Sequence, residues 1–508
     1  MKRLLSLLAL ICLLSTSATH AQVGDLPRST PEAERISSRA IQRFFESIQA
    51  LPATEIHHLM VVRNGRVVAE CHPAPYRATD SHTLFSASKT LTALAVGIAI
   101  SQNRLSTSDR IVTFFPAKLP EKVTPELASI TVKDLLIMAS GIKPDWEMRS
   151  FGDDWIREWL AKPVTSKPGT RFQYDSMCTF MLSAIVQKAT GKTVLQLLNQ
   201  HLFGPMHIYE AEWELSPDGI CTGGWGLRMQ AESLAKIGIL MLQRGQWEGR
   251  QLISEAWIDE CTKPYINYDG AALQKPTEKN QGYGYQLWRC LKPGAYRLDG
   301  AYGQFVVIDP ATETVVVILG SSDKTADELA CIPAYLYPGI DSPIPENKNQ
   351  LKTLEQVAAK AALPMPKGKP TSNAFTNADF KLAKNDHNID LIKFYTENGQ
   401  NQLRIYYTDT RDETIPVAYN RWAYGALTTT TPPYVITARN RFSGLKHNFA
   451  TAATYAWTTP TKLHIQLQYV NWISATDIVI DTQAQTATFT NNFNRNKPQT
   501  VTCAIVSQ

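Results

Sequence analysis

Two apolar runs, residues 59–62 and 67–69, flank Arg63-Asn64-Gly65-Arg66, and Asn-Gly between such runs is the strongest short-range signal for a β-hairpin. Residues 305–308 and 315–319 predict a second hairpin. Between the two hairpins apolar residues recur at helical spacing, so strands at both ends and helices between them predict one α+β domain. Helices are predicted from the start signal Ser29-Thr30-Pro31-Glu32 to about 49, from 86 to about 100, after a capping box at Thr131–Asp134, and over 178–190, 231–244 and 327–336.

The pattern changes near residue 341. Prolines punctuate residues 341–373 and one short helix is predicted there, over about 348–362, so this stretch is interpreted as a linker. From residue 374 apolar and polar positions alternate in short runs with polar turns, which predicts a C-terminal all-β barrel or sandwich. The predicted organisation is therefore a signal segment (1–21), an α+β domain (22–340), the linker (341–373) and a β domain (374–508).

The first residues contain the three parts of a secretory signal in order: Lys2-Arg3, an apolar stretch over 4–14, and a cleavage site at Thr19-His20-Ala21. No other run approaches the length of uninterrupted apolar chain that a membrane span needs. We therefore expect a periplasmic or secreted protein whose mature chain has no membrane span.

Composition narrows the function classes. The chain has 508 residues, of which 44% are hydrophobic and 19% charged, as in globular proteins. The net charge of +5 is not gathered into a Lys/Arg stripe, so no nucleic-acid partner is expected. The histidines do not cluster with acids at ligand spacing, and His57 and His58, adjacent in a strand, are expected to point to opposite faces. Neither a metal nor an organic cofactor is expected.

The eight cysteines include Cys12 in the signal segment and show no CxxC pairing, which argues against a zinc or redox motif. Export would allow some of the others to oxidise, and Cys261–Cys290 is a possible disulfide. Buried free thiols are the alternative interpretation.

Ser86-Ala87-Ser88-Lys89 is an SxxK tetrad that opens a long apolar helix. In the first turn of a helix, backbone N–H groups favour developing negative charge, and residues i and i+3 share a face, so the Lys89 amine can reach Ser86 Oγ. Serine is a poor nucleophile unless a base takes its proton. The alternative is a capping serine with an exposed lysine. The other SxxK matches are in loop-like or turn-like settings at Ser140, Ser321 and Ser443, or on an expected surface helix at Ser233.

Five further blocks, in order along the chain, resemble the family of class C β-lactamases, related esterases, D-aminopeptidases and 6-aminohexanoate-oligomer hydrolases. The resemblance runs from about Glu55 to Leu336 and implies a β-lactamase/transpeptidase-like fold, with an antiparallel sheet flanked by helices plus an all-helical region. The blocks are Thr131-Val-Lys-Asp-Leu-Leu-Ile-Met-Ala-Ser-Gly141, Pro168-Gly-Thr-Arg-Phe-Gln-Tyr174, Gly223-Gly-Trp-Gly-Leu-Arg-Met229, Gly282-Tyr-Gly-Tyr-Gln-Leu-Trp288 and Gly300-Ala-Tyr-Gly-Gln304.

The resemblance assigns roles to residues of this chain. Ser86 is implied as the acylated nucleophile, Lys89 as its general base and Tyr174 as a proton shuttle. A phenol beside a cationic lysine is expected to have a lowered pKa. The oxyanion hole would consist of the backbone N–H groups of Ser86 and Ala301.

Two departures from the family bear on the substrate. Ser176 stands where the family's tyrosine motif commonly has Asn, and Leu298-Asp299-Gly300 replaces a lysine- or histidine-based KTG-like motif. An aspartate repels the substrate carboxylate that such a cation helps to hold. Asp299 either attracts an amine or faces solvent, and the sequence leaves both open. The substrate-binding candidates are Ser176, Asp299, Gly300 and Gln304.

These features predict an exported serine hydrolase that acts on ester or amide bonds of a small-molecule or peptide substrate. One alternative is a peptidoglycan or D-amino-acid peptide hydrolase, or a β-lactamase. A second is a non-catalytic β-lactam- or ligand-binding protein. The sequence leaves open the substrate, the oligomeric state and the role of the β domain.

Overall fold

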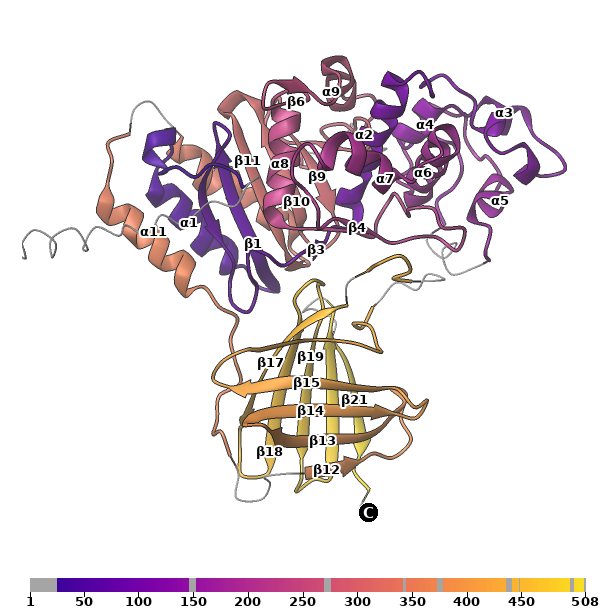
Figure 1. Ribbon diagram of the computed structural model, residues 1–508. Helices are drawn as coiled ribbons and strands as arrows, with labels where there is room; N and C mark the ends of the chain where they lie inside the picture. The colour runs from indigo at the N-terminus through magenta and orange to yellow at the C-terminus, as the bar shows by residue number, and fades with distance from the viewer. Residues whose placement is uncertain are drawn as a thin grey trace, which may run out of the picture.

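The computed structural model describes residues 25–145, 152–268, 276–340, 344–371, 378–434, 441–446, 448–493 and 498–506. The predicted signal segment lies outside these residues. Figure 1 shows a larger part of helices and sheet, and below it a curled β domain formed by the C-terminal part of the chain. The α+β and all-β fold classes predicted from the sequence are both confirmed.

The central sheet is antiparallel, with strand order β2-β1-β11-β10-β9-β8. Alternate residues of its middle strands enter two cores. Met60 and Val317 join the core under α8, whereas Val61 and Val316 join the core under α1. Both faces are therefore covered, which explains the continuous apolar runs of these strands. The strands are β1 Thr54–Arg63, β2 Arg66–Cys71, β8 Trp288–Arg289, β9 Tyr296–Gly300, β10 Gln304–Asp309 and β11 Thr314–Ser322.

Both predicted hairpins are present, β1–β2 and β10–β11. Asn64 and Gly65 have φ of 50° and 74°, as an Asn-Gly turn requires. Two small sheets complete this part of the chain: one of three strands, β3 His82–Thr83, β4 Glu212–Trp213 and β5 Leu227–Met229, and one of two, β6 Gln246–Trp247 and β7 Arg250–Gln251.

Each predicted helix is present, with one correction to a start, and the structure adds short helices over 125–129, 155–160, 194–198 and 255–262 that were not predicted. The N-terminal helix begins at Ser38, not near Ser29, because a 3-10 turn over Glu32–Glu34 ends at Arg35 in a left-handed conformation. Glu32 is buried and its carboxylate accepts hydrogen bonds from the Ser38 amide (2.8 Å) and hydroxyl (2.9 Å), so it caps the new helix. The helices are α1 Ser38–Gln49, α2 Ser88–Ser101, α3 Pro125–Ser129, α4 Val132–Leu136, α5 Trp155–Leu160, α6 Ser176–Thr190, α7 Val194–Leu198, α8 Ala231–Leu242, α9 Glu255–Thr262, α10 Thr325–Cys331 and α11 Lys348–Lys360.

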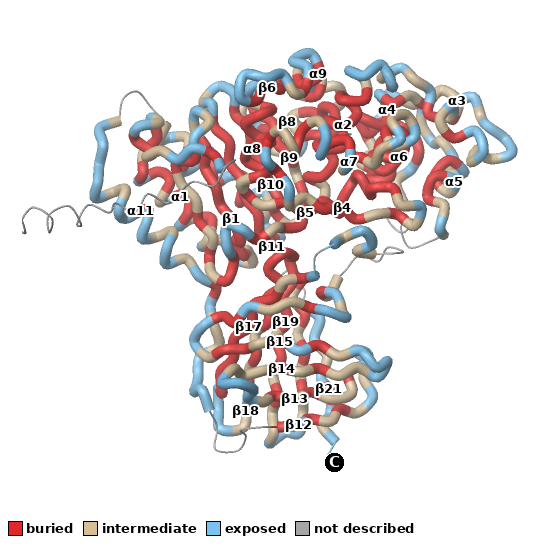
Figure 2. Tube along the Cα trace, in the orientation of Figure 1, coloured by how far each residue is buried: buried red, intermediate tan, exposed pale blue. Residues whose placement is uncertain are grey.

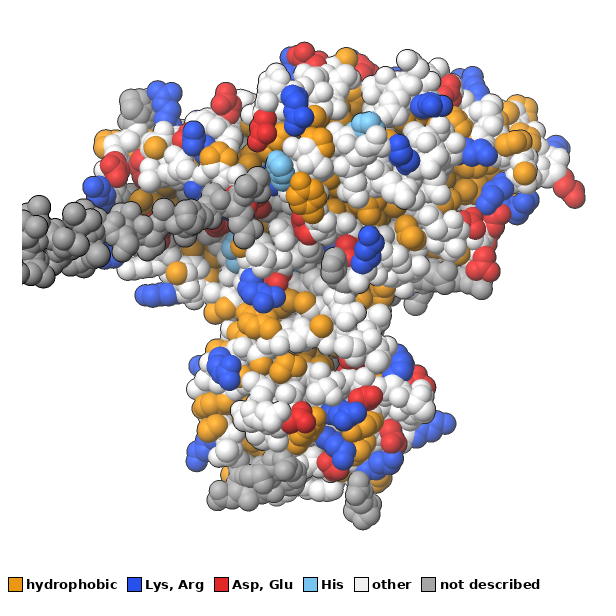
Figure 3. Space-filling view, viewed as in Figure 1, with side chains coloured by type: hydrophobic (Ala, Val, Ile, Leu, Met, Phe, Trp, Pro, Cys, Tyr) orange, Lys and Arg blue, Asp and Glu red, His pale blue; other side chains and the backbone are white. Residues whose placement is uncertain are grey.

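Helix α11, in the stretch interpreted as a linker, packs against α1 and β2 with Leu354 buried. None of the helices in the described ranges combines the length and hydrophobicity that crossing a membrane needs. Figure 3 shows acidic and basic side chains scattered over the visible face without a patch of one sign.

The C-terminal sheet curls into a barrel. Its order is β12-β13-β14-β15-β17-β18-β19-β20-β21, with β16 paired to β17. A bridge between Leu382 and Ile505 brings its two ends together, and its strands alternate buried and partly exposed residues (Figure 2). The strands are β12 Ala378–Lys381, β13 Ile389–Glu397, β14 Gln400–Tyr407, β15 Asp412–Tyr419, β16 Ala423–Ala426, β17 Ala450–Trp457, β18 Lys462–Tyr469, β19 Ala475–Asp481, β20 Thr486–Asn492 and β21 Gln499–Ala504.

Two points that the sequence raised are decided by the structure. Cys261 and Cys290 are both buried free thiols, in agreement with the alternative interpretation, so the possible disulfide is not formed. The expectation for the adjacent histidines is wrong. His57 and His58 do not diverge, because a β-bulge lies between Ile56 and His58. Both imidazoles instead contact the Tyr76 ring, at 3.9 and 5.8 Å between centroids.

Two of the other SxxK serines also differ from expectation. Ser321 is in strand β11 rather than in a turn. Ser233 lies on α8 but is buried, as is Lys236, whose amine donates to the backbone carbonyl of Met206 (3.1 Å). Lys236 therefore ties α8 to the turn that contains Met206 and does not face solvent.

Candidate active site

Ser86 lies in the 3-10 turn Phe85–Ala87, which leads directly into α2. The Ala87 amide donates to the Leu84 carbonyl (3.0 Å), and Ser88 Oγ donates to the Phe85 carbonyl (2.6 Å), so the turn is fixed from both sides. Ser86 is partly exposed, whereas Lys89, one turn further on, is 1% exposed. The turn thus presents a hydroxyl at the surface with a buried amine behind it.

Lys89 Nζ contacts Ser86 Oγ at 2.9 Å, Ser176 Oγ at 3.0 Å and the Gly224 carbonyl at 2.7 Å. It also lies 4.9 Å from the centre of the Tyr174 ring. Three oxygen atoms thus surround Lys89 Nζ, and the contact with Ser86 Oγ is the one through which a proton can pass between the two side chains. These contacts hold the amine against the hydroxyl of Ser86, the geometry that general-base catalysis needs.

Tyr174 comes from the segment before α6, and its phenol hydrogen-bonds to Ser86. The ring is packed by Trp288 and Tyr283, at 5.8 and 6.3 Å between centroids. Burial, with a further contribution from Asp299, raises the pKa of Tyr174. The predicted lowering of the Tyr174 pKa is therefore wrong, because exclusion of water by the aromatic neighbours outweighs the effect of the hydrogen bond to Ser86. The phenol is protonated at neutral pH.

Asp175, between Tyr174 and Ser176, is the N-cap of α6. Its carboxylate accepts hydrogen bonds from the Met177 amide (2.9 Å) and the Trp159 indole (3.2 Å). Burial raises its pKa. This cap directs the first turn of α6 toward Lys89, so Ser176 lies in the predicted site although it is shorter than the asparagine it replaces.

The end of β9 packs against the Ser86 turn. Gly300 allows this approach, because a Cβ there would lie 2.2 Å from the Leu84 carbonyl oxygen and 3.2 Å from the Ala87 nitrogen. Ala301 follows in an exposed turn. The two residues implied as oxyanion donors, Ser86 and Ala301, therefore belong to turns that touch.

Gln304 does not have the substrate-binding position expected of it. It is fully buried, and its amide nitrogen donates to the carbonyls of Ala301 (3.1 Å), Tyr302 (3.1 Å) and Gly320 (2.8 Å). Its oxygen accepts from the Gly320 amide (3.3 Å). Gln304 therefore holds the turn that carries Ala301.

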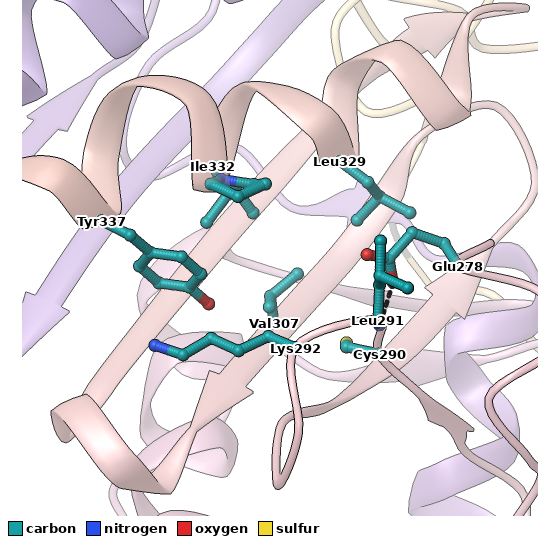
Figure 4. Close-up of a pocket in the computed structure, with 9 residues that line it drawn as sticks. Glu278, Cys290, Leu291, Lys292, Val307, Leu329, Ile332 and Tyr337 are labelled. Atoms are coloured by element: carbon teal, nitrogen blue, oxygen red, sulfur yellow. Dashed lines mark hydrogen bonds between the residues drawn. The ribbon is translucent and has the colours of Figure 1, made fainter. Parts of the chain in front are cut away.

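Asp299 forms an ion pair with Arg297 of the same chain, whereas the sequence left open that it attracts a substrate amine or faces solvent. The buried Arg297 guanidinium lies 2.9 Å from the Asp299 carboxylate and 3.1 Å from that of Glu278. One cation thus faces two carboxylates, and the group has a net negative charge. Glu278 also accepts a hydrogen bond from the Leu291 amide (3.1 Å), and both residues line a mainly apolar cavity of about 220 Å³ under α10 (Figure 4).

Several neighbours of the site were not singled out from the sequence. Gly224, Tyr283 and Trp288 lie in the blocks that carried the family resemblance, so a signal for them existed. Arg297 and the aromatic residues of the β domain had none, because their positions depend on contacts between distant segments.

Comparison with known proteins shows that the chain is a serine hydrolase. It belongs to the β-lactamase family, whose model matches residues 44–336. It is 25% identical over 296 residues to the 6-aminohexanoate-dimer hydrolase of Paenarthrobacter ureafaciens, covering 54% of this chain and 74% of that protein. A putative β-lactamase from Bacteroides dorei has a similar fold, with a TM-score of 0.50 and 15% identity over 59% of this chain and 99% of that one. The β domain lies outside the family match.

Proposed function

We propose that this protein hydrolyses ester or linear amide bonds through an acyl-enzyme on Ser86, with Lys89 as general base and Tyr174 as proton relay. The observation that carries the proposal is the contact of Lys89 Nζ with Ser86 Oγ at 2.9 Å, next to the Tyr174 phenol, which is hydrogen-bonded to the same serine. A nucleophile and base within hydrogen-bonding reach are what covalent catalysis requires.

In the proposed reaction, Ser86 Oγ attacks the carbonyl carbon while its proton passes to the neutral Lys89 amine. The backbone N–H groups of Ser86 and Ala301 stabilise the oxyanion. Tyr174 gives its phenolic proton to the leaving group and regains one from Lys89. Water then attacks the acyl-enzyme by the same proton route in reverse, releasing the acid and restoring Ser86. A raised pKa suits this role, because the phenol starts protonated.

The charge beside the site supports the proposed substrate class. The Arg297–Asp299–Glu278 group beside the site has a net negative charge, which disfavours the carboxylate of a β-lactam or of a peptide ending in a D-amino acid. The similarity to a 6-aminohexanoate-dimer hydrolase supports a linear amide as one substrate class. Neither a metal nor an organic cofactor takes part in the proposed mechanism.

We also propose that the protein is exported to the periplasm or beyond, on the strength of the signal-like residues 1–21. Fractionation of the native host would detect it there, at the mass expected after cleavage. Full-length protein in the cytoplasm would contradict the proposal.

Turnover of p-nitrophenyl esters, linear amides, D-amino-acid amides and a chromogenic cephalosporin tests the catalytic proposal. Ser86→Ala is expected to abolish ester or amide turnover, with little cephalosporin cleavage by the wild type. Ser233→Ala, which alters another SxxK tetrad, is the matched control and should retain activity. Rapid cephalosporin turnover would refute the substrate class, and activity that survives Ser86→Ala would refute the nucleophile.

A further inference from the structure

Each turn of the proposed oxyanion hole contains an aromatic residue in the left-handed region. Phe85, directly before Ser86, has φ of 46°, and Tyr302, directly after Ala301, has φ of 65°. Their rings are 5.3 Å apart between centroids. Bulky residues rarely adopt this conformation, and it persists only where the surroundings hold it.

The surroundings of Phe85 come from the β domain. Its ring centroid lies 5.7 Å from that of Trp472 and 6.5 Å from that of Tyr434. Phe85 is 5% exposed and belongs to the apolar cluster of the barrel, and Tyr302 packs against the same cluster. Residues next to both proposed oxyanion donors are thus anchored in another domain.

Trp472 is the centre of this contact. It lies in the loop between β18 and β19, is 2% exposed, and also packs on Tyr434 (5.4 Å) and Phe442 (5.2 Å). Its indole N–H has no hydrogen-bond partner within the described residues. Replacing Trp472 would therefore remove packing without removing a hydrogen bond seen in these ranges.

A second contact leads toward Lys89. Arg441, stacked on Tyr434 at 3.9 Å, forms an ion pair with the buried Glu214. The Glu214 backbone is hydrogen-bonded to Thr222 (2.9 Å) and Gly226 (3.0 Å), on either side of the Gly224 carbonyl that accepts from Lys89. The β domain therefore contacts the supports of the base as well as those of the oxyanion hole.

We propose that the C-terminal β domain is a positioning element of the active site, with Trp472 holding the Phe85 and Tyr302 turns so that the Ser86 and Ala301 amides converge. This inference rests on the proposed function of Ser86. Trp472 is a positioning residue, since it acts through Phe85 and touches no reacting atom.

The test compares Trp472→Ala with Trp457→Ala in the full-length protein. Trp457 is a matched control, because it is a buried tryptophan of the same domain core but pairs with Leu463 at the start of β18, whereas Trp472 follows the other end of that strand. The readouts are kcat and KM for p-nitrophenyl butyrate, the rate of fluorophosphonate labelling, and the thermal midpoint, with kinetics measured well below that midpoint.

Trp472→Ala is expected to lower kcat and the labelling rate roughly 10- to 100-fold with little change in KM, as a misplacement of about 1 Å does. Trp457→Ala should lower the midpoint yet retain kcat, and Trp472→Phe should recover most of the lost kcat. Tyr434→Ala, at the cluster's edge, should show a smaller loss and allows the comparison if Trp472→Ala does not fold.

A wild type without Ser86-dependent turnover would remove the proposed function, and this inference with it. A wild type that is active, with Trp472→Ala and Tyr434→Ala matching Trp457→Ala in kcat, would overturn the positioning role alone.

Discussion

Replacing Gly300 by alanine tests how closely β9 must approach the nucleophile turn. The new Cβ would lie 2.2 Å from the Leu84 carbonyl oxygen, and real Cβ atoms essentially never lie within 3.0 Å of another atom. The two segments must therefore separate by about 1 Å, and a misplacement of that size can cost about 10²-fold in rate. Pairing of Gly300 with Gln304 on β10 resists any retreat of the strand.

We expect Gly300→Ala to lower kcat about 100-fold for p-nitrophenyl esters. Gly294→Ala is the control, because a Cβ there has open space but φ is +85°. The left-handed strain should cost Gly294→Ala about 1–2 kcal/mol of unfolding free energy in a urea titration, with kcat near wild type. A folded Gly300→Ala variant with wild-type kcat would refute the proposed oxyanion geometry.

Four further predictions concern single groups. Burial raises the pKa of Glu328 from 4.5 to about 8, so its contribution to stability is full below pH 4.5 and is lost as pH rises through 8. In Glu328→Gln the unfolding free energy should fall less steeply between pH 4.5 and 8, by up to about 1.4 kcal/mol per pH unit. Urea titrations at several pH values measure this, and the same dependence on pH in both proteins would contradict the prediction. Tyr174→Phe should lower kcat about 10²- to 10⁴-fold, because the proton relay is lost. If the wild-type rate–pH profile shows a titration near neutral pH that disappears in Tyr174→Phe, the tyrosine acts as a phenolate base, which would contradict its role as a protonated relay. Ser176→Ala should cost about 10-fold in kcat through loss of one Lys89 contact, with Ser176→Asn near wild type; equal kcat in all three proteins would exclude a role for this side chain. Asp299→Asn should lower KM for anionic substrates such as cephalosporins relative to neutral esters, and an unchanged ratio would show that this carboxylate does not select the substrate.

The elements that local sequence signals determine were predictable. Asn64-Gly65 and the Thr131 capping box gave a turn and a helix start that depend only on neighbouring residues. Ser86 and Lys89 could be paired because helical spacing alone brings i and i+3 together. The start of α1 was missed because the buried Glu32 carboxylate, rather than Pro31, sets it.

What depends on distant packing could not be predicted. The sign of the Tyr174 pKa shift depends on burial against Tyr283 and Trp288, which a nearby lysine does not reveal. No pattern of apolar and polar positions predicts the ion pair of Asp299 with Arg297 or the contact of Trp472 with Phe85.

Peptide mass spectrometry after brief exposure to a fluorophosphonate tests the role of Ser86 most directly. We predict a single adduct, on the peptide that contains Ser86, and no adduct on folded Ser86→Ala protein. An adduct on a different serine, or an unlabelled but folded wild type, would contradict the assignment of Ser86 as the nucleophile.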